Sequence, residues 1–165
     1  MNDLDVHVER LGPMRVASVR AISRSPEEDA WSILRAWAQP VGLFDDPVAH
    51  PVFGFNNPSP SPGADEYGYE FWIAVGPGTH SPGGIVLKDF EGGLYAVTTC
   101  AVGPDMPQRW EALVRWVESS PHTWRRSTHE LERLHNPLAP PQEMLVDLCL
   151  PIVNAECQMP NPNDR

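Results

Sequence analysis

GGLYAVTTCAVG at residues 92–103, followed by WEALVRW at residues 110–116, decides how this chain can fold, because the same arrangement occurs earlier in the sequence. There, GPMRVASVRAIS at residues 12–23 precedes WSILRAW at residues 31–37. In both places a glycine-led turn opens a β-type run, and a helical segment with paired tryptophans follows. The same features in the same order predict a duplicated structural unit.

Both tryptophan-bearing segments have the periodicity of amphipathic helices. In the first, the apolar side chains share one stripe at a period of about 3.6 residues, and Ser32 and Arg35 lie opposite. Ser25 is a plausible N-cap with Pro26 at the first helical position. Pro121 marks the end of the second helix. Each helix therefore has one apolar stripe to bury against a sheet.

Two strand signals follow each helix and complete a strand-helix-strand-strand unit in each half of the chain. They are HPVFGFNNP (50–58), YGYEFWIAV (67–75), THELERLHNP (128–137) and EMLVDLCLPI (143–152). We therefore expect an α+β domain over residues 1–152, with an antiparallel sheet, two helices on one face and a ligand cleft on the other. Residues 153–165 lose the periodicity and predict a flexible tail.

The strand YGYEFWIAV alternates between two kinds of side chain, which is typical of a strand with two different environments. We expect Tyr69, Phe71, Ile73 and Val75 to face the helices, and Glu70 and Trp72 to face the uncovered side. On that side Glu70 either lines a cleft or pairs with an arginine such as Arg15 or Arg133. In residues 129–135 the alternation groups Glu130 with Glu132 but leaves the buried face undecided.

The composition argues against several functional classes. The chain has 165 residues, enough for one domain, and a formal net charge of −10, which repels phosphate backbones. The densest basic stretch is Arg125-Arg126, so we expect no nucleic-acid binding by this chain alone. The charged N-terminus is unlike a signal peptide, and no apolar run reaches the roughly 18 residues of a membrane helix. We therefore expect a cytoplasmic protein without a membrane partner.

Neither the cysteines nor the histidines form a metal-binding pattern. Cys100, Cys149 and Cys157 contain no CxxC pair, and their odd number argues against a disulfide framework. His129 and His135 have no carboxylate or cysteine at ligand spacing. GPGTHSPGG at residues 76–84 lacks the sequence of a phosphate-binding loop and predicts a hairpin-type loop. We expect no metal and no cofactor.

Several segments, in chain order, resemble the GyrI-like small-molecule-binding domain, also called the AraC-type effector-binding domain. They are FGFNNPSP (53–60), YGYEFWIAV (67–75), FEGGLYAVTTC (90–100), WEALVRWVESS (110–120), LERLHNP (131–137) and VDLCLPI (146–152). The resemblance runs from Val6 to Ile152 and is to the stand-alone members, which lack a helix-turn-helix domain. It implies a duplicated strand-helix-strand-strand fold with a ligand cleft on the pseudo-twofold axis.

The resemblance also implies the centre of the site. In the family, flat, hydrophobic and often cationic molecules lie between aromatic side chains and face a buried glutamate, which by motif position is Glu132. Relatives often have an aromatic residue two positions before the leucine-glutamate pair or a tyrosine two positions after it. Here His129 and Leu134 stand at those positions, so the stacking around Glu132 is expected to differ.

We select nine candidate ligand-binding residues from the pattern and the resemblance together. They are Glu132, Glu70, Trp72, Tyr67, Tyr95, Phe53, Trp124, Trp37 and Trp110. The helix tryptophans are better explained by core packing, although Trp37 and Trp110 are near enough to helix ends to reach a cleft edge. Phe53 fits either core or cleft. An aromatic cleft desolvates a carboxylate and raises its pKa, and two nearby carboxylates split their pKa values.

Three functions remain open at this point. The first is binding of a hydrophobic, aromatic or cationic small molecule, as in drug or toxin binding or sensing. The second is hydrolysis of strained cyclopropane rings of DNA-alkylating natural products, with Glu132 and Glu70 as the acid/base groups. The third is a protein-interaction module that modulates gyrase or another partner through its acidic surface. The sequence separates neither the first two functions nor the candidate ligands.

Overall fold

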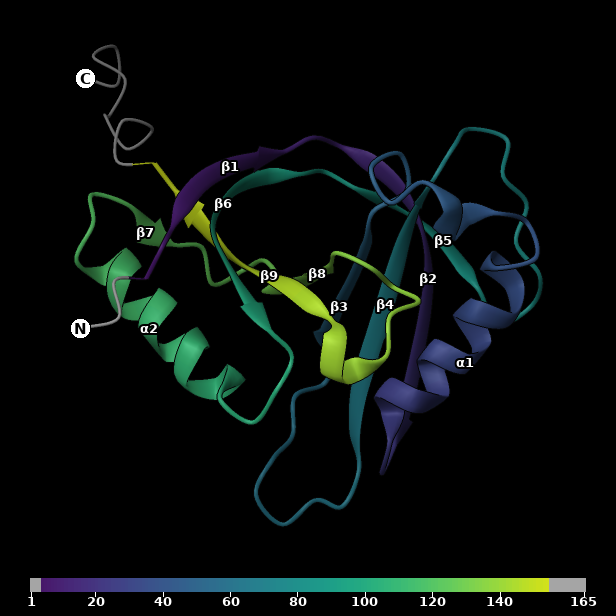
Figure 1. Cartoon of the computed structure of the whole chain (residues 1–165), viewed down its shortest axis with the longest axis horizontal. Helices are drawn as coiled ribbons and strands as arrows, with labels where there is room; N and C mark the ends of the chain where they lie inside the picture. The colour runs from purple at the N-terminus through teal and green to yellow at the C-terminus, as the bar shows by residue number, and fades with distance from the viewer. Residues whose placement is uncertain (1–3, 155–165) are drawn as a thin grey trace, which may run out of the picture.

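The computed structural model describes residues 4–154, which form one nine-stranded sheet, two α-helices and two short 3-10 helices (Figure 1). The first half contains β1 (His7–Leu11), β2 (Met14–Ser23), α1 (Pro26–Ala38), β3 (Val52–Asn56), β4 (Tyr67–Val75) and β5 (Val86–Phe90). The second half contains β6 (Gly93–Ala101), α2 (Met106–Glu118), β7 (Thr123–Trp124), β8 (Leu131–Leu134) and β9 (Leu145–Val153). The 3-10 helices are Leu43–Asp45 and Pro141–Glu143.

The order of the strands confirms the duplicated unit. The sheet runs β1-β6-β9-β8-β3-β4-β2-β5, with β7 attached to β9, and its pairs are antiparallel. The unit β2-α1-β3-β4 and the unit β6-α2-β8-β9 occupy equivalent places on either side of the β3–β8 pair. That pair therefore lies on the pseudo-twofold axis of the domain, and the predicted fold class is confirmed.

Both helices pack on the same face of the sheet. Helix α1 lies over β2 and β4, and α2 lies over β6 and β9, so the two helices stand apart from each other in Figure 1. Each helix buries most of the apolar stripe that its sequence predicts, with Leu34 in α1 and Leu113 in α2 fully buried, but Ile33 of the α1 stripe is exposed. Phe71 and Ile73 of β4 belong to this helix-side core, as expected.

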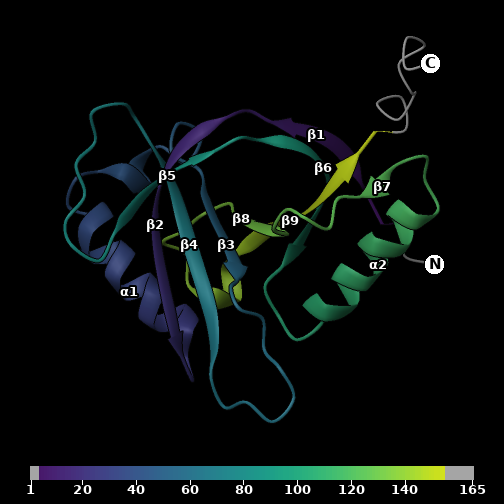
Figure 2. The ribbon, with the colours of Figure 1, turned by 180° about the vertical axis from the view of Figure 1, so that it is seen from behind.

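A second hydrophobic core occupies the face without helices. It joins residues from strands right across the sheet, including Val16 of β2, Phe53 of β3, Tyr95 of β6 and Leu131 of β8. Side chains from distant strands meet on one face only when the sheet curls around them, and Figure 2 shows β1 and β6 arching over toward β5. The face that was expected to be open for a ligand is therefore largely filled by its own side chains.

Two local expectations change with the structure. The loop at residues 76–84 is no hairpin turn, because β4 and β5 lie on opposite sides of β2 instead of pairing with each other. Strand β9 continues to Val153, one residue past the expected domain boundary, and residues 155–165 of the expected tail lie outside the described residues. Cys100 and Cys149 are buried free thiols, and Cys157 also lies outside the described part.

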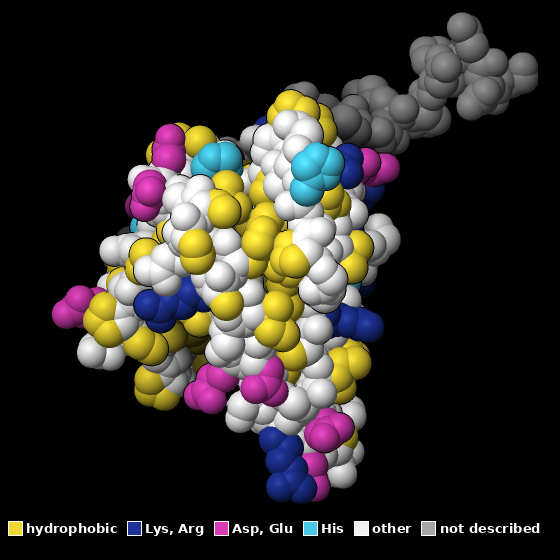
Figure 3. Space-filling model, turned by 90° about the vertical axis from the view of Figure 1, so that its right-hand side faces the viewer, with side chains coloured by type: hydrophobic (Ala, Val, Ile, Leu, Met, Phe, Trp, Pro, Cys, Tyr) yellow, Lys and Arg dark blue, Asp and Glu magenta, His cyan; other side chains and the backbone are white. Residues whose placement is uncertain are grey.

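The surface and the helices add two further observations. None of the helices within residues 4–154 has both the length and the apolar character needed to span a bilayer. Figure 3 shows hydrophobic side chains at the surface on the face that carries α1, with acidic and basic side chains scattered among them. Ile33 of α1 and Val48 in the following loop are among the exposed hydrophobic residues.

Candidate functional site

Glu132 is the carboxylate on which polar contacts of the helix-covered face converge. It lies in β8, and Tyr69 of β4 donates a hydrogen bond to its Oε2 atom at 3.0 Å. The indole of Trp110, near the start of α2, also donates a hydrogen bond to this carboxylate. Strands and a helix from both halves of the chain therefore hold the Glu132 side chain on the pseudo-twofold axis.

The strand register explains why Tyr69 reaches Glu132. Glu132 pairs with Gly54 of β3, and Gly54 pairs with Phe71 of β4, so Glu132 shares the helix-covered face with Phe71. Gly54 has no side chain, and a Cβ atom there would collide with the ring and the hydroxyl of Tyr69. The ring of Tyr69 therefore lies across the bare backbone of Gly54, with its hydroxyl group at Glu132.

Burial sets the electrostatics of this contact. Desolvation raises the pKa of Glu132, hydrogen bonds from Tyr69 and Trp110 oppose that rise, and the nearby charge of Glu27 adds to it. Burial and the negative charge of Glu132 raise the pKa of Tyr69 well above its usual value, so this hydroxyl is a permanent donor. Glu132 is thus a poorly solvated carboxylate whose two hydrogen-bond partners are neutral.

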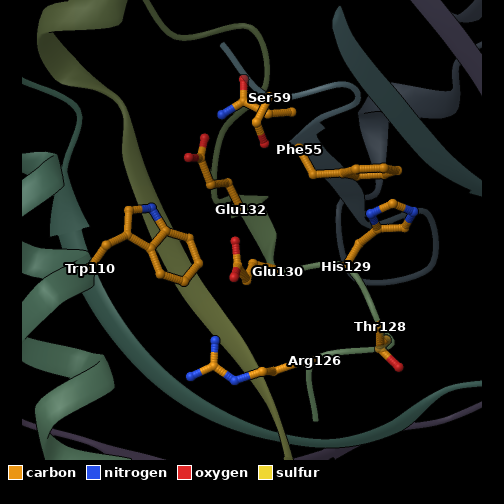
Figure 4. A pocket seen from close by; sticks show the side chains of 9 residues that line it. Phe55, Ser59, Trp110, Arg126, Thr128, His129, Glu130 and Glu132 are labelled. Atoms are coloured by element: carbon orange, nitrogen blue, oxygen red, sulfur yellow. The ribbon is translucent and has the colours of Figure 1, made fainter. Parts of the chain in front are cut away.

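A pocket of about 230 Å³ opens beside Glu132. The pairing of β3 with β8 stops at Gly54 and Glu132, and beyond that point the rings of Phe55 and His129 stack with centroids 4.4 Å apart. Figure 4 shows Glu132, Glu130 and the nitrogen-bearing edge of Trp110 directed toward the same space. The pocket therefore occupies the gap where the two central strands separate, on the pseudo-twofold axis.

The mouth of the pocket carries further charged residues. Glu130 is exposed there, and partial desolvation raises its pKa while His129 and Arg126 oppose the rise. The guanidinium carbon of Arg126 lies 4.1 Å from the ring centroid of Trp124, a cation–π contact. A second hollow of about 430 Å³ adjoins the pocket and shares Trp110 and Glu130 with it. Trp110 therefore stands between the two spaces.

Glu70 lies on the opposite face of the sheet from Glu132. It pairs in register with Phe55, whose side chain belongs to the second core, and it is only 2% exposed. Trp72 Nε1 donates to it at 3.0 Å, and Lys88 Nζ donates to it at 2.8 Å. The structure thus separates the two carboxylates that the sequence grouped together, and it gives Glu70 a lysine partner where an arginine was considered.

The other predicted site residues divide between pocket and core. Trp110 lines both the pocket and the adjoining hollow, and Trp124 lines the hollow. Trp72 lines a separate pocket of about 280 Å³ on the face without helices. The remaining four lie elsewhere: Phe53 and Tyr95 are 1% and 0% exposed in the second core, Trp37 packs against the helix-side core, and Tyr67 donates to both carboxylate oxygens of Glu27.

Several residues of the site were not selected from the sequence. Tyr69 contacts Glu132 but does not itself line the pocket. The unselected residues that do line it are Phe55, Asn56, Ser59, Arg126, Thr128, His129 and Glu130. The alternation in YGYEFWIAV placed Tyr69 correctly on the helix side but gave no sign of its contact with Glu132. The signal that could have found it is Gly54, because a glycine in a central strand often marks close approach by a neighbouring group. Within residues 4–154 no group of three or more His, Cys, Asp or Glu side chains has the arrangement of a metal site.

Comparison with known families and structures gives a consistent result. A family profile described as Cass2, integron-associated effector binding protein, matches residues 8–152. A search of curated proteins found no match. The solved C-terminal domain of EcmrR is similar with a TM-score of 0.68 and 13% identity, over 92% of this chain and 99% of that one. Against EcmrR in its DNA complex, this chain spans only 57% of the longer protein, with a TM-score of 0.67, 14% identity and 91% of this chain covered.

Two further solved structures share the fold. A hydrolase from Listeria innocua is similar with a TM-score of 0.65 and 13% identity, over 90% of this chain and 91% of that one. SAV2435, solved with bound tetraphenylphosphonium, is similar with a TM-score of 0.53 and 14% identity, over 94% of this chain and 98% of that one. At these identities the likeness concerns the fold alone.

Proposed function

The chain belongs to the family of integron-associated effector-binding proteins, and we propose that it binds a flat aromatic cation in the pocket beside Glu132. Membership of this family implies a small-molecule ligand. The chemical nature of that ligand is our proposal, and the environment of Glu132 supports it.

The observation that carries the proposal is a partly buried, poorly solvated carboxylate whose hydrogen-bond donors are neutral. Tyr69 and Trp110 donate to Glu132, and no basic side chain in the described part of the chain forms an ion pair with it. An ionised carboxylate in a poorly solvated place is costly unless a positive charge accompanies it. A cationic ligand would supply that charge, and Glu132 would then bind as its counter-charge.

The walls of the pocket suit a flat ring system. Trp110 lies on one side, and the stacked pair of Phe55 and His129 lies on the other. Aromatic faces attract both flat apolar surfaces and cations. A pocket of about 230 Å³ is small for a drug-sized molecule, so a larger ligand would extend past Trp110 into the adjoining hollow. SAV2435, which has the same fold, was solved with an aromatic cation bound.

Fluorescence titration with the cationic dye rhodamine 123 tests the proposal. The wild-type chain is expected to bind the dye, and Glu132→Gln is expected to weaken binding by tenfold or more, roughly the value of a charge-assisted contact. The control is Glu28→Gln, which removes the same charge from an exposed position in α1. Equal affinities for wild type and Glu132→Gln, or no binding at all, would contradict the proposal.

A second candidate function rests on Glu130. Glu130 and Glu132 line one pocket, and desolvation raises the pKa of both. Two such carboxylates can divide the roles of general acid and general base. Hydrolysis of a strained electrophilic ring is therefore the alternative, with Glu130 in the place that the sequence had given to Glu70. Mass spectrometry for a water adduct of a cyclopropane-bearing electrophile separates turnover from binding.

The protein-interaction hypothesis makes a different prediction. If the chain acted on gyrase or another partner through its acidic surface, Glu132→Gln would leave function intact and reversals of surface charge would abolish it. On the face shown in Figure 3, acidic side chains are dispersed among basic and hydrophobic ones. That face therefore gives no specific support to the interaction hypothesis.

A further inference from the structure

The charges around the pocket are divided between its two ends. Glu132 lies toward Ser59, Arg126 lies at the opposite end, and Glu130 lies between them (Figure 4). Trp110 extends along the side of the same space. A ligand that fills the pocket would therefore meet a partly buried negative charge at one end and an exposed positive charge at the other.

Arg126 is a cation without a strong local partner. Its recorded contact is with the ring of Trp124 at 4.1 Å, and within residues 4–154 no carboxylate lies at ion-pair distance from its guanidinium group. Its charge is felt by Glu130, whose pKa it lowers against the rise from desolvation. A guanidinium presents several N–H donors in one plane, which suits a carboxylate or another oxyanion.

We propose that this pocket selects dipolar aromatic ligands, with a cationic group at the Glu132 end and a carboxylate or other anionic group at the Arg126 end. The inference rests on the proposed function, because it assigns a second recognition element to the same site. A ligand with only a positive charge satisfies Glu132 but brings its charge toward Arg126. A ligand with both charges satisfies both ends, and the exposed position of Arg126 lets it leave Trp124 and pair with the ligand.

The neighbouring arginine provides a matched control. Arg125 is adjacent in sequence and carries the same charge, yet it lines the pocket on the opposite face together with Trp72 and Phe90. Arg125→Gln and Arg126→Gln thus change the net charge of the protein equally. Only Arg126→Gln changes the charge inside the Glu132 pocket.

Rhodamine 110 and its methyl ester, rhodamine 123, form a suitable pair of probes. They share the cationic ring system and differ in one group, a free carboxylate in rhodamine 110 and a neutral ester in rhodamine 123. We expect the wild-type chain to bind rhodamine 110 about fivefold more tightly than rhodamine 123, the size expected for one partly exposed ion pair. Arg126→Gln should remove this preference, and Arg125→Gln should keep it. The preference should also narrow at high ionic strength.

The outcomes separate the inference from the function on which it rests. If both dyes bind with equal affinity and both lose affinity in Glu132→Gln, the cation site stands and the dipolar selection is overturned. A preference for rhodamine 110 that remains in Arg126→Gln also overturns the dipolar selection, because a residue other than Arg126 must then bind the carboxylate of the dye. If neither dye binds to the wild-type chain, the proposed function and the inference both fail.

Discussion

Tyr69 and Glu132 are 63 positions apart in the chain, and the Tyr69 hydroxyl donates a 3.0 Å hydrogen bond to Glu132 Oε2 across the backbone of Gly54. Tyr69 belongs to the first of the two repeated units, and Glu132 belongs to the second. The contact therefore depends on the β3–β8 pairing that joins the halves. It also places Glu132, the carboxylate proposed to bind the ligand, on the side of the sheet that the helices cover.

Tyr69→Phe should raise the pKa of Glu132 further, because it removes a donor that favours the ionised carboxylate. Cationic dye binding then requires a higher pH, and the midpoint of a binding-versus-pH curve should move upward. Loss of one hydrogen bond should lower the free energy of unfolding by about 1 kcal/mol. Tyr67→Phe is the control, since that hydroxyl binds Glu27 instead. Equal shifts in both variants would argue against a specific role for Tyr69.

Gly54→Ala should damage the site without touching a ligand. The added methyl group collides with the Tyr69 ring, so Tyr69 must move away from Glu132. Overpacking of this kind costs about 1–3 kcal/mol of stability, and dye affinity should fall with it. Gly83→Ala is the matched control, because a Cβ atom at Gly83 meets nothing within 4 Å. Thermal unfolding and dye titration of both variants check the prediction, and a fully active, stable Gly54→Ala protein would contradict it.

Local patterns in the sequence were sufficient to predict the two repeated units of the fold. They were not sufficient to predict that the sheet curls around a second core. The repeated turn, strand and helix identified both halves, and the apolar stripes correctly placed Leu34 and Leu113 beneath the helices. The curl that brings Phe53, Tyr95 and Leu131 into one core arises from contacts between distant strands. Alternation within a strand reports two faces, and it does not report whether the second face is open or closed by the sheet itself.

The site shows the same limit. Resemblance to a family identified Glu132, and the structure places that residue in a pocket on the pseudo-twofold axis. The face of Glu132 could not be read from residues 129–135, because charged and apolar side chains occur at both alternating sets of positions. The pairing of Glu132 with Gly54 decides which face of the sheet Glu132 occupies. That pairing depends on two strands and cannot be read from the sequence of one. Glu70 was grouped with Glu132 for lack of that information.

Binding of a cation should weaken as the pH falls through the raised pKa of Glu132. Protonation removes the counter-charge, and desolvation makes this happen above the usual pH range of a glutamate. The stability of the fold depends on pH in the opposite direction. The folded state binds a proton at Glu132 more readily than the unfolded state does, because the pKa is raised. The contribution of Glu132 to the free energy of unfolding therefore decreases as the pH rises through the raised pKa. Dye titrations from pH 4 to 8 check the first effect, and Glu132→Gln should flatten the curve. A wild-type curve as flat as that of the variant would rule Glu132 out as the titrating group.

Asp147 should control stability at low pH without affecting the pocket. It accepts hydrogen bonds from Thr99, His135 and Arg133, and although desolvation raises its pKa, these contacts hold the pKa below its usual value. Asp147 therefore contributes to the free energy of unfolding at pH values above its pKa in the unfolded chain. This contribution is lost as the pH falls through its lower pKa in the folded protein. Asp147→Asn should lower the free energy of unfolding by about 2 kcal/mol near neutral pH, because it removes a charged hydrogen-bond acceptor. Arg133 keeps its ion pair with Glu9, so the variant does not leave the guanidinium group unpaired.

Asp89→Asn gives the comparison for Asp147. Asp89 pairs with Arg15 at 3.7 Å, but its side chain is 83% exposed, and surface pairs of this kind contribute little. Urea unfolding of both variants should show a large loss of stability for Asp147→Asn and almost none for Asp89→Asn. Dye affinity should stay at the wild-type value in both. Similar stabilities for the two variants would mean that the Asp147 network is not a stabilising one.

The pairing of Glu70 with Lys88 should be structural and independent of ligand binding. Lys88→Met leaves Glu70, which is 2% exposed, with only the Trp72 indole as a donor. An uncompensated buried carboxylate should cost about 3 kcal/mol or more. Adding Glu70→Gln to Lys88→Met removes the stranded charge, so the double variant should be more stable than Lys88→Met alone. Dye affinity should remain unchanged in the double variant, because Glu70 and Glu132 lie on opposite faces. Loss of dye binding at unchanged stability would instead make Glu70 a ligand contact.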